Sequence, residues 1–153
     1  MQPPVTKLSI SLLGPFQAAL DGVPLQGFRT AKVRALLAYL SVESYRPWPR
    51  SILADLLWPD LPEVDAQSNL RNAISNLRKV IGDHRNDPPF LLISQEVLQF
   101  NLQAAAWLDV KTFTDLITSA SRADGEARRL QDLAVLESAL ELYRGDFMEG
   151  FSI

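Results

Sequence analysis

The order of hydrophobic patterns along this chain of 153 residues predicts an α+β fold. Short apolar runs near the N-terminus indicate an antiparallel sheet, three helical patterns follow, and a second pair of apolar runs indicates a hairpin. Beyond Trp107 only helical periodicity continues. We therefore expect a mixed domain over residues 1–103, followed by a partial all-α segment over residues 104–153.

The predicted N-terminal sheet covers residues 8–25, whose sequence is LSISLLGPFQAALDGVPL. Gly14-Pro15 interrupts the first run, and Asp21-Gly22 is a hairpin signal between residues 16–20 and residues 23–25. A first helix is predicted over residues 30–40, with Thr30 as a candidate N-cap. A second, short helix is predicted from Arg50 to Trp58, where Pro59 ends it. Its expected inner face is Ile52, Leu53, Leu56 and Leu57.

The third helical pattern, within residues 66–81, has an unusual polar face. At about 100° per residue its apolar side chains fall within one arc: Ala66, Leu70, Ala73, Ile74, Leu77, Val80 and Ile81. The opposite arc holds cations and short amide or hydroxyl groups, and residues 66–79 contain three bases and no acid. Solvated helices usually mix charge signs. A surface helix that happens to lack acids is the competing interpretation.

Arg and Asn are the side chains that complement base edges in the major groove, whereas Lys and Ser suit phosphates. The candidate base-reading residues are Arg71, Asn72, Ser75 and Asn76. The candidate phosphate contacts are Ser68, Arg78, Lys79, Arg29, Lys32 and Arg50. Two helices joined by a turn, the second polar and cationic, predict a helix-turn-helix. The closing hairpin within residues 89–101 would make it winged.

Net charge is −3, but it is unevenly distributed. Residues 1–102 hold ten Lys/Arg and nine Asp/Glu, a balance of +1, whereas residues 103–153 hold five and nine, a balance of −4. Local potential decides whether a helix approaches a phosphate backbone, so a small binding face is compatible with the negative total.

Other function classes find little support in the sequence. There is no cysteine, no metal-ligand cluster, no phosphate-binding Gly-rich loop and no nucleophile motif, so we expect neither an enzyme nor a cofactor. The single histidine, His84, lies in a polar loop and is expected to be exposed. No signal peptide and no apolar run of membrane-spanning length is present, so we expect a cytoplasmic protein without a membrane partner.

Several segments together resemble the DNA-binding domain of SARP-type antibiotic-regulatory transcriptional activators. They are residues 8–25, TAKVRALLAYL (30–40), LADLLWPD (53–60), LRNAISNLRKVIG (70–82) and PFLLISQEVLQFN (89–101). Residues 109–151, including DVKTF and ALELYRGDFMEGF, resemble the start of the bacterial transcriptional activator domain, a tetratricopeptide-like helical domain.

This resemblance implies an OmpR-type winged helix whose third helix enters the major groove of promoter DNA. It also implies protomers that associate on direct repeats, and recruitment of RNA polymerase, for which the 59–65 connection is the expected contact. The hairpin tip, Gln95-Glu96, departs from the basic wing that would best reach a phosphate. The alternative function is a protein-interaction module that uses the same fold, or its helical pair, without specific DNA binding.

Overall fold

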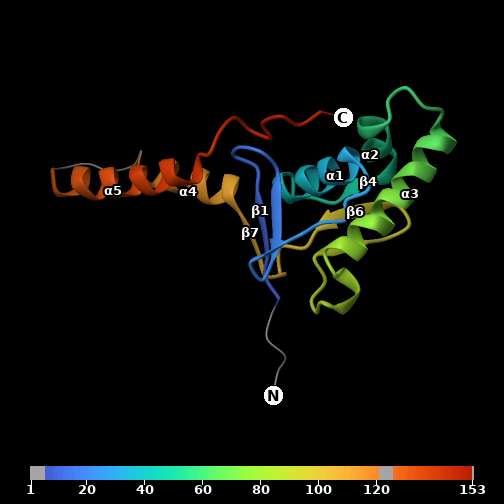
Figure 1. The fold of residues 1–153 in the computed structure, drawn as a ribbon, viewed down its shortest axis with the longest axis horizontal. Coiled ribbons are helices and arrows are strands. Elements are labelled where there is room, and N and C mark those ends of the chain that lie inside the picture. Colours follow the sequence, from blue (N-terminus) through green and yellow to red (C-terminus); the bar gives the residue numbers. More distant parts are fainter. Residues whose placement is uncertain (1–5, 121–125, 153) are drawn as a thin grey trace, which may run out of the picture.

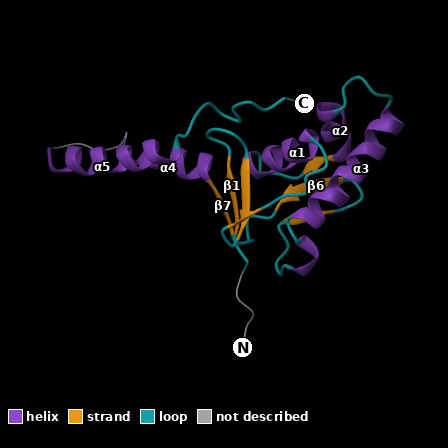
Figure 2. Cartoon of the chain, viewed as in Figure 1, coloured by secondary structure: helices purple, strands orange, loops and turns teal. Residues whose placement is uncertain are grey.

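The structure is a computed structural model that describes residues 6–120 and 126–152, with the backbone alone for residues 120 and 126–130. Within this part of the chain there are five α-helices and two β-sheets, which confirms the α+β class (Figure 1 and Figure 2). Helix α3 (Glu63–Val80) lies at one side of the molecule. Helices α4 (Asp109–Ala120) and α5 (Glu126–Leu142) extend to the opposite side.

The first sheet has the strand order β3-β2-β1-β7. The strands are β1 (Leu8–Ser11), β2 (Gln17–Leu20), β3 (Val23–Pro24) and β7 (Ala106–Leu108). The three N-terminal strands are antiparallel, as the turn signals predicted, and Asp21-Gly22 forms the turn between β2 and β3. The sequence did not reveal β7, which pairs parallel to β1. The predicted domain boundary after residue 103 stays a prediction. Strand β7, which lies beyond that boundary, is the outermost strand of the N-terminal sheet.

The second sheet has the order β4-β6-β5. The hairpin predicted within residues 89–101 consists of β5 (Leu91–Ile93) and β6 (Val97–Phe100). A two-residue strand that the sequence did not reveal, β4 (Trp48–Pro49), pairs with β6 immediately before α2 (Arg50–Leu57) begins. The hairpin is thereby attached to the start of α2.

Helix α1 (Ala31–Val42) begins after Thr30, which occupies the N-cap position without a capping bond from its side chain. Helix α2 is correctly placed, but its predicted inner face is partly wrong. Leu53, Ala54 and Leu57 are buried, whereas Ile52 and Leu56 are 43% and 48% exposed. Eight residues make little more than two turns, so the helix presents only one narrow stripe to the core.

The sequence allows α3 to begin at Pro62 or after Asp65, and the helix begins at Glu63, directly after Pro62. Its two acids, Glu63 and Asp65, lie in the first turn and two of its three bases, Arg78 and Lys79, lie in the last, which suits the helix dipole. Gly82 follows the helix with φ +65°, the left-handed conformation expected for a residue that ends a helix. A short 3-10 helix, η1 (Asp83–Arg85), comes next.

A single apolar core joins the first sheet, the three N-terminal helices and the hairpin. Its largest fully buried side chains are Phe90, Leu8, Ile10, Leu12, Leu36, Leu37, Leu40, Leu53, Leu70, Leu77, Ile81 and Leu98. Six of the seven residues that the periodicity of this segment assigned to the core are buried, and the seventh, Val80, is half-buried. Burial of this apolar surface is the main stabilising contribution, and it determines which face of α3 is left exposed.

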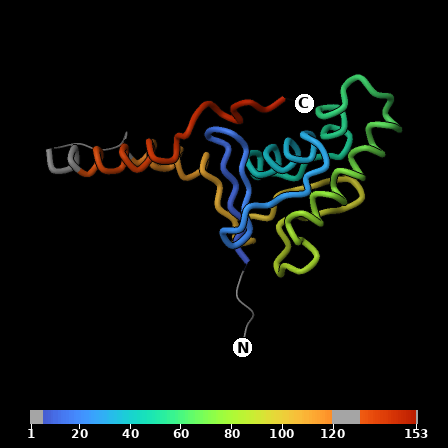
Figure 3. The backbone as a smooth tube through the Cα atoms, in the orientation of Figure 1, coloured from blue at the N-terminus to red at the C-terminus, as the bar shows by residue number. Residues whose placement is uncertain are grey.

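Helices α4 and α5 pack against each other and are attached to the segment that follows β1. The carboxylate of Asp109, which is 1% exposed, accepts hydrogen bonds from the backbone N–H groups of Leu12 and Leu13 at 2.8–2.9 Å. After α5 the chain turns back along the molecule, and residues 144–149 exchange backbone hydrogen bonds with residues 12–14 (Figure 3). The sequence also predicts a linker-like stretch over residues 121–126, and most of it lies outside the described residues.

Candidate nucleic-acid interface

The exposed face of α3 is a continuous polar stripe. Packing of the apolar arc against the core leaves five predicted site residues exposed: Ser68, Arg71, Asn72, Ser75 and Lys79. Ser68, Asn72, Ser75 and Lys79 follow one another at a spacing of three or four residues, and Arg71 lies next to Asn72 and three residues after Ser68, so all five lie on one side of the helix. Only Glu63 and Asp65 carry negative charge on α3, and both precede the stripe. The stripe therefore presents two cations with short hydrogen-bonding groups between them.

Arg50 adds a second cation beside this stripe. Its Nε donates to the Ser94 carbonyl at 3.0 Å, and its backbone N–H donates to the Glu96 carbonyl at 2.9 Å. Burial lowers the pKa of the Arg50 guanidinium, and the positive charge of Arg71 lowers it further. Arg50 is the first residue of α2, which packs against α3, so both cations belong to this pair of helices. Both positive charges lie on these two helices, whereas Glu96 in the hairpin turn is negative.

Asn76 does not share the exposed stripe, although the sequence placed it there. It is 7% exposed. Its Oδ1 accepts from the Arg29 backbone N–H at 3.0 Å, and its Nδ2 donates to the Gly27 carbonyl at 3.1 Å. Both ends of the amide are thus occupied by backbone groups. This geometry does not fit the predicted base-reading role.

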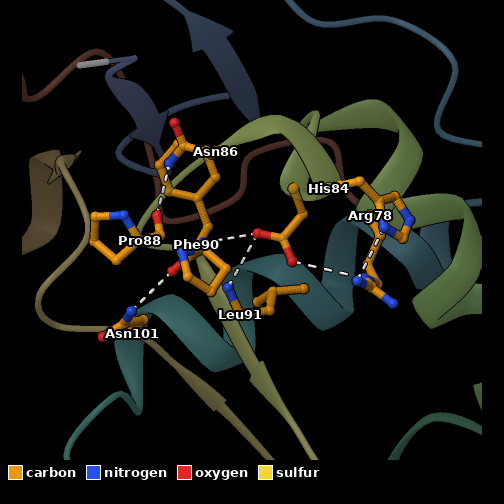
Figure 4. Close-up of polar contacts among 9 residues, drawn as sticks. Arg78, His84, Asn86, Pro88, Phe90, Leu91 and Asn101 are labelled. Atoms are coloured by element: carbon orange, nitrogen blue, oxygen red, sulfur yellow. Dashed lines mark hydrogen bonds and ion pairs between the residues drawn. The ribbon is translucent and has the colours of Figure 1, made fainter. Parts of the chain in front are cut away.

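Arg78 is half-buried and its guanidinium is engaged by neighbouring side chains. Its Nε lies 3.6 Å from Oδ2 of Asp83, and a terminal nitrogen lies 3.1 Å from Nδ1 of His84 (Figure 4). Asp83 is buried and accepts from the backbone N–H groups of Phe90 at 2.7 Å and Leu91 at 3.3 Å. Arg78 and Asp83 therefore tie the end of α3 to the first strand of the hairpin. The predicted phosphate role of Arg78 loses support.

Lys32 is similarly engaged. Its Nζ donates to the Leu57 carbonyl at 2.6 Å and lies 5.3 Å from the centre of the Trp58 ring. Arg29, by contrast, is exposed, and its guanidinium makes no hydrogen bond or ion pair with the described residues. Arg29 is the cation of this pair that is free to reach a ligand.

A cleft of about 520 Å³ separates the start of α1 from α3. Its lining includes Arg29, Lys32, Trp58, Asn69 and Asn72. Asn69 is half-buried and was not singled out from the sequence. The signal was available, because Asn69 precedes Asn72 by three residues and so lies on the adjoining part of the helix surface.

The tip of the hairpin is a closed turn. Ser94 Oγ accepts from the backbone N–H groups of Glu96 at 3.3 Å and Val97 at 3.0 Å. Gln95 and Glu96 are exposed at the tip, so its outward charge is negative. His84 is exposed as expected, and Trp48 is buried in the core with its indole N–H donating to the Glu43 carbonyl.

Residues 6–120 and 126–152 offer neither a metal site nor a membrane span. No group of three or more His, Cys, Asp or Glu side chains in these ranges is placed to hold a metal ion. No described helix combines the length and the apolar character that a membrane span requires.

The comparisons with known proteins confirm the resemblance to SARP-type transcriptional regulators. No family model matches the chain. The transcriptional regulatory protein EmbR of Mycobacterium tuberculosis is 37% identical over 86 residues, which are 56% of this chain and 22% of EmbR. The regulatory protein AfsR of Streptomyces coelicolor is 32% identical over 145 residues, 94% of this chain and 14% of AfsR.

The structural comparison agrees with the sequence relatives. The structure of M. tuberculosis EmbR in complex with a low affinity phosphopeptide superposes with a TM-score of 0.80 at 29% identity. The match covers 95% of this chain and 38% of EmbR. The chain thus spans well under half the length of EmbR and AfsR. These relatives are named as regulators of transcription, and the expectation that this chain is not an enzyme stays a prediction.

Proposed function

We propose that this chain is a sequence-specific DNA-binding regulator of transcription whose helix α3 enters the major groove. The observation that carries the proposal is the exposed stripe of α3, which contains no acid and retains Arg71, Asn72 and Ser75 at helical spacing. In this account α2, α3 and the β5–β6 hairpin form the winged helix-turn-helix. The names of EmbR and AfsR and the fold of EmbR support a regulator of transcription.

The side chains divide into two groups by their chemistry. Arg71, Asn72 and Ser75 read base edges, since guanidinium, amide and hydroxyl groups match the donors and acceptors there. Ser68, Lys79, Arg29 and Arg50 contact phosphates, which fix the register of the helix without specifying sequence. Each good bidentate base contact is worth about 1–3 kcal/mol of discrimination.

The connection between α2 and α3 is the proposed contact for RNA polymerase. Four apolar side chains are exposed on α2, on this connection and at the start of α3: Ile52, Leu56, Leu61 and Val64, the last 80% exposed. Exposed apolar groups near one another commonly mark protein interfaces. In transcription reactions with purified polymerase, Leu56→Ser/Leu61→Ser should keep promoter binding and lose activation. Unchanged activation would refute this assignment.

A second candidate function is a protein-interaction module. The observation that favours it is the apolar surface of α5 and the segment beyond it, where large side chains are exposed: Leu133, Leu136, Leu140, Tyr143 and Phe147. The two functions differ in their response to salt. A contact through several phosphates weakens steeply as salt rises, whereas an apolar interface does not.

The experiment that tests the proposal is selection of binding sites from random duplex DNA, followed by titration of the selected duplex at two salt concentrations. We expect enrichment of a short motif, present as a direct repeat if two protomers bind side by side, and salt-sensitive affinity. Lys111→Ala is the matched control, because this exposed lysine lies on α4 away from the stripe. Failure to enrich any motif, with equal affinity for all duplexes, would refute sequence-specific binding.

A further inference from the structure

Asn76 connects α3 to a segment almost fifty residues earlier in the chain. Residues 25–30, here called the strap, run from β3 to α1. Asn76 accepts from the Arg29 N–H at 3.0 Å and donates to the Gly27 carbonyl at 3.1 Å. The Asn76 side chain is buried. Its amide therefore supplies the backbone hydrogen bonds that a neighbouring β-strand would otherwise make with the strap.

The strap is fixed on its other side as well. The Phe28 ring packs edge-to-face on Phe16, with the ring centres 5.6 Å apart. Gly27 has φ +100°, a conformation that other residues rarely adopt, and it passes over Val80 at the end of α3. The position of the residue that follows Phe28 is therefore determined from two directions.

That residue is Arg29, which is exposed and whose guanidinium makes no hydrogen bond or ion pair with the described residues. Arg29 lines the same cleft as Asn72 and Asn69 of α3. A cation at this point stands beside the exposed stripe, where the DNA backbone would pass in the proposed function.

Only an amide can both accept from the Arg29 N–H and donate to the Gly27 carbonyl with one short side chain. Aspartate would keep the acceptor for the Arg29 N–H but would set a second oxygen against the Gly27 carbonyl. Alanine would leave both backbone groups without this partner. Asn76 is thus suited to hold the strap and is unavailable to a base.

We infer that Asn76 is a positioning residue for DNA binding, which holds Arg29 at a phosphate beside α3. The inference rests on the proposed function and assigns Asn76 a part that works through Arg29. Removing Asn76 releases Arg29 and costs one phosphate contact. It therefore weakens binding to every duplex by the same factor and leaves the sequence preference intact.

The test is a double-mutant cycle with Asn76→Ala, Arg29→Ala and the double variant. Affinities for the selected duplex and for a scrambled duplex are measured from about 50 to about 200 mM salt, the range over which phosphate contacts are most evident. Asn86→Ala is the matched control, because Asn86 also donates to a backbone carbonyl, that of Pro88, but lies outside the strap. Hydrogen exchange of the Arg29 amide and thermal unfolding accompany each variant.

We expect Asn76→Ala and Arg29→Ala each to reduce the slope of log affinity against log salt by about 0.9, and the double variant to reduce it no further. Exchange of the Arg29 amide should accelerate in Asn76→Ala and not in Asn86→Ala. A lowered unfolding temperature with an unchanged slope would make Asn76 merely structural and overturn the inference. A changed preference at one base position would restore the base-reading role.

The wild-type titration distinguishes failure of the proposed function from failure of the inference about Asn76. If the wild-type protein shows neither a selected motif nor salt-dependent binding, the proposed function and this inference both fail. If the wild-type protein binds as expected and only the Asn76 slope is unchanged, the inference fails alone.

Discussion

The proposed division of α3 into base-reading and phosphate-contacting residues makes a quantitative prediction for Lys79→Ala and Arg71→Ala. Three cations are assigned to phosphates: Arg29, Arg50 and Lys79. Each neutralised phosphate contributes about 0.9 to the slope of log affinity against log salt, so the wild-type slope should be about −2.7. Affinity should then fall about 40-fold between about 50 and about 200 mM salt.

Lys79→Ala removes one of these contacts. Its slope should be about −1.8, so that the same increase in salt lowers affinity only about 12-fold. The loss should be equal on the selected and the scrambled duplex, because a phosphate contact carries no sequence information.

Arg71→Ala should behave differently, because Arg71 is assigned to a base edge. It should lose about 1–3 kcal/mol on the selected duplex, a factor of about 5 to 150, and much less on the scrambled one. The assay is fluorescence anisotropy with both duplexes over the salt series, with Lys111→Ala as the control for loss of a distant charge. Equal losses of Arg71→Ala on both duplexes would refute base reading by Arg71.

Three further predictions concern the groups that hold the interface in place. Asp109→Ala should lower the free energy of unfolding by about 2–4 kcal/mol in urea titrations, because it leaves the buried N–H groups of Leu12 and Leu13 unpaired; a change below about 0.5 kcal/mol, typical of surface sites, would contradict this. Asp83→Ala should cost a similar amount, about 2–4 kcal/mol, since Phe90 and Leu91 lose their acceptor and Arg78 its ion pair; calorimetry would show no shift if the network were unimportant. Glu96→Lys should strengthen binding to all duplexes and steepen the salt slope if the hairpin tip lies near a phosphate, and unchanged titrations would place the tip away from DNA.

Much of the fold could be predicted from periodicity alone. The apolar face of α3, which includes Leu70 and Leu77, is buried in the core. Gly82 follows the helix in the left-handed conformation that glycine commonly adopts there. Pairings between distant segments were not visible in local patterns. Strand β7 pairs with β1 across almost a hundred residues, and the Asp109 carboxylate accepts from the backbone N–H groups of Leu12 and Leu13, which are equally distant in the sequence.

Local sequence patterns also fail to show which single residues of the candidate site are exposed. Asn72 and Asn76 are the same residue type on adjacent turns, and a helical wheel places both on the polar face. Only the strap, which packs against one of them, buries Asn76 and leaves Asn72 exposed. Arg78 and Lys32 likewise look like free cations until Asp83 and the Leu57 carbonyl are found beside them.

The central claim, that the exposed stripe of α3 faces DNA, is tested most directly by site-specific cross-linking. The chain contains no cysteine, so a single introduced thiol carries a photoactivatable group at one known position. Ser75→Cys lies in the middle of the stripe, and Ser138→Cys lies exposed on α5 as the control. We predict efficient cross-links from position 75 to bases of the selected duplex and none from position 138. Equal cross-linking from both positions, or none from position 75 on bound duplex, would contradict the account.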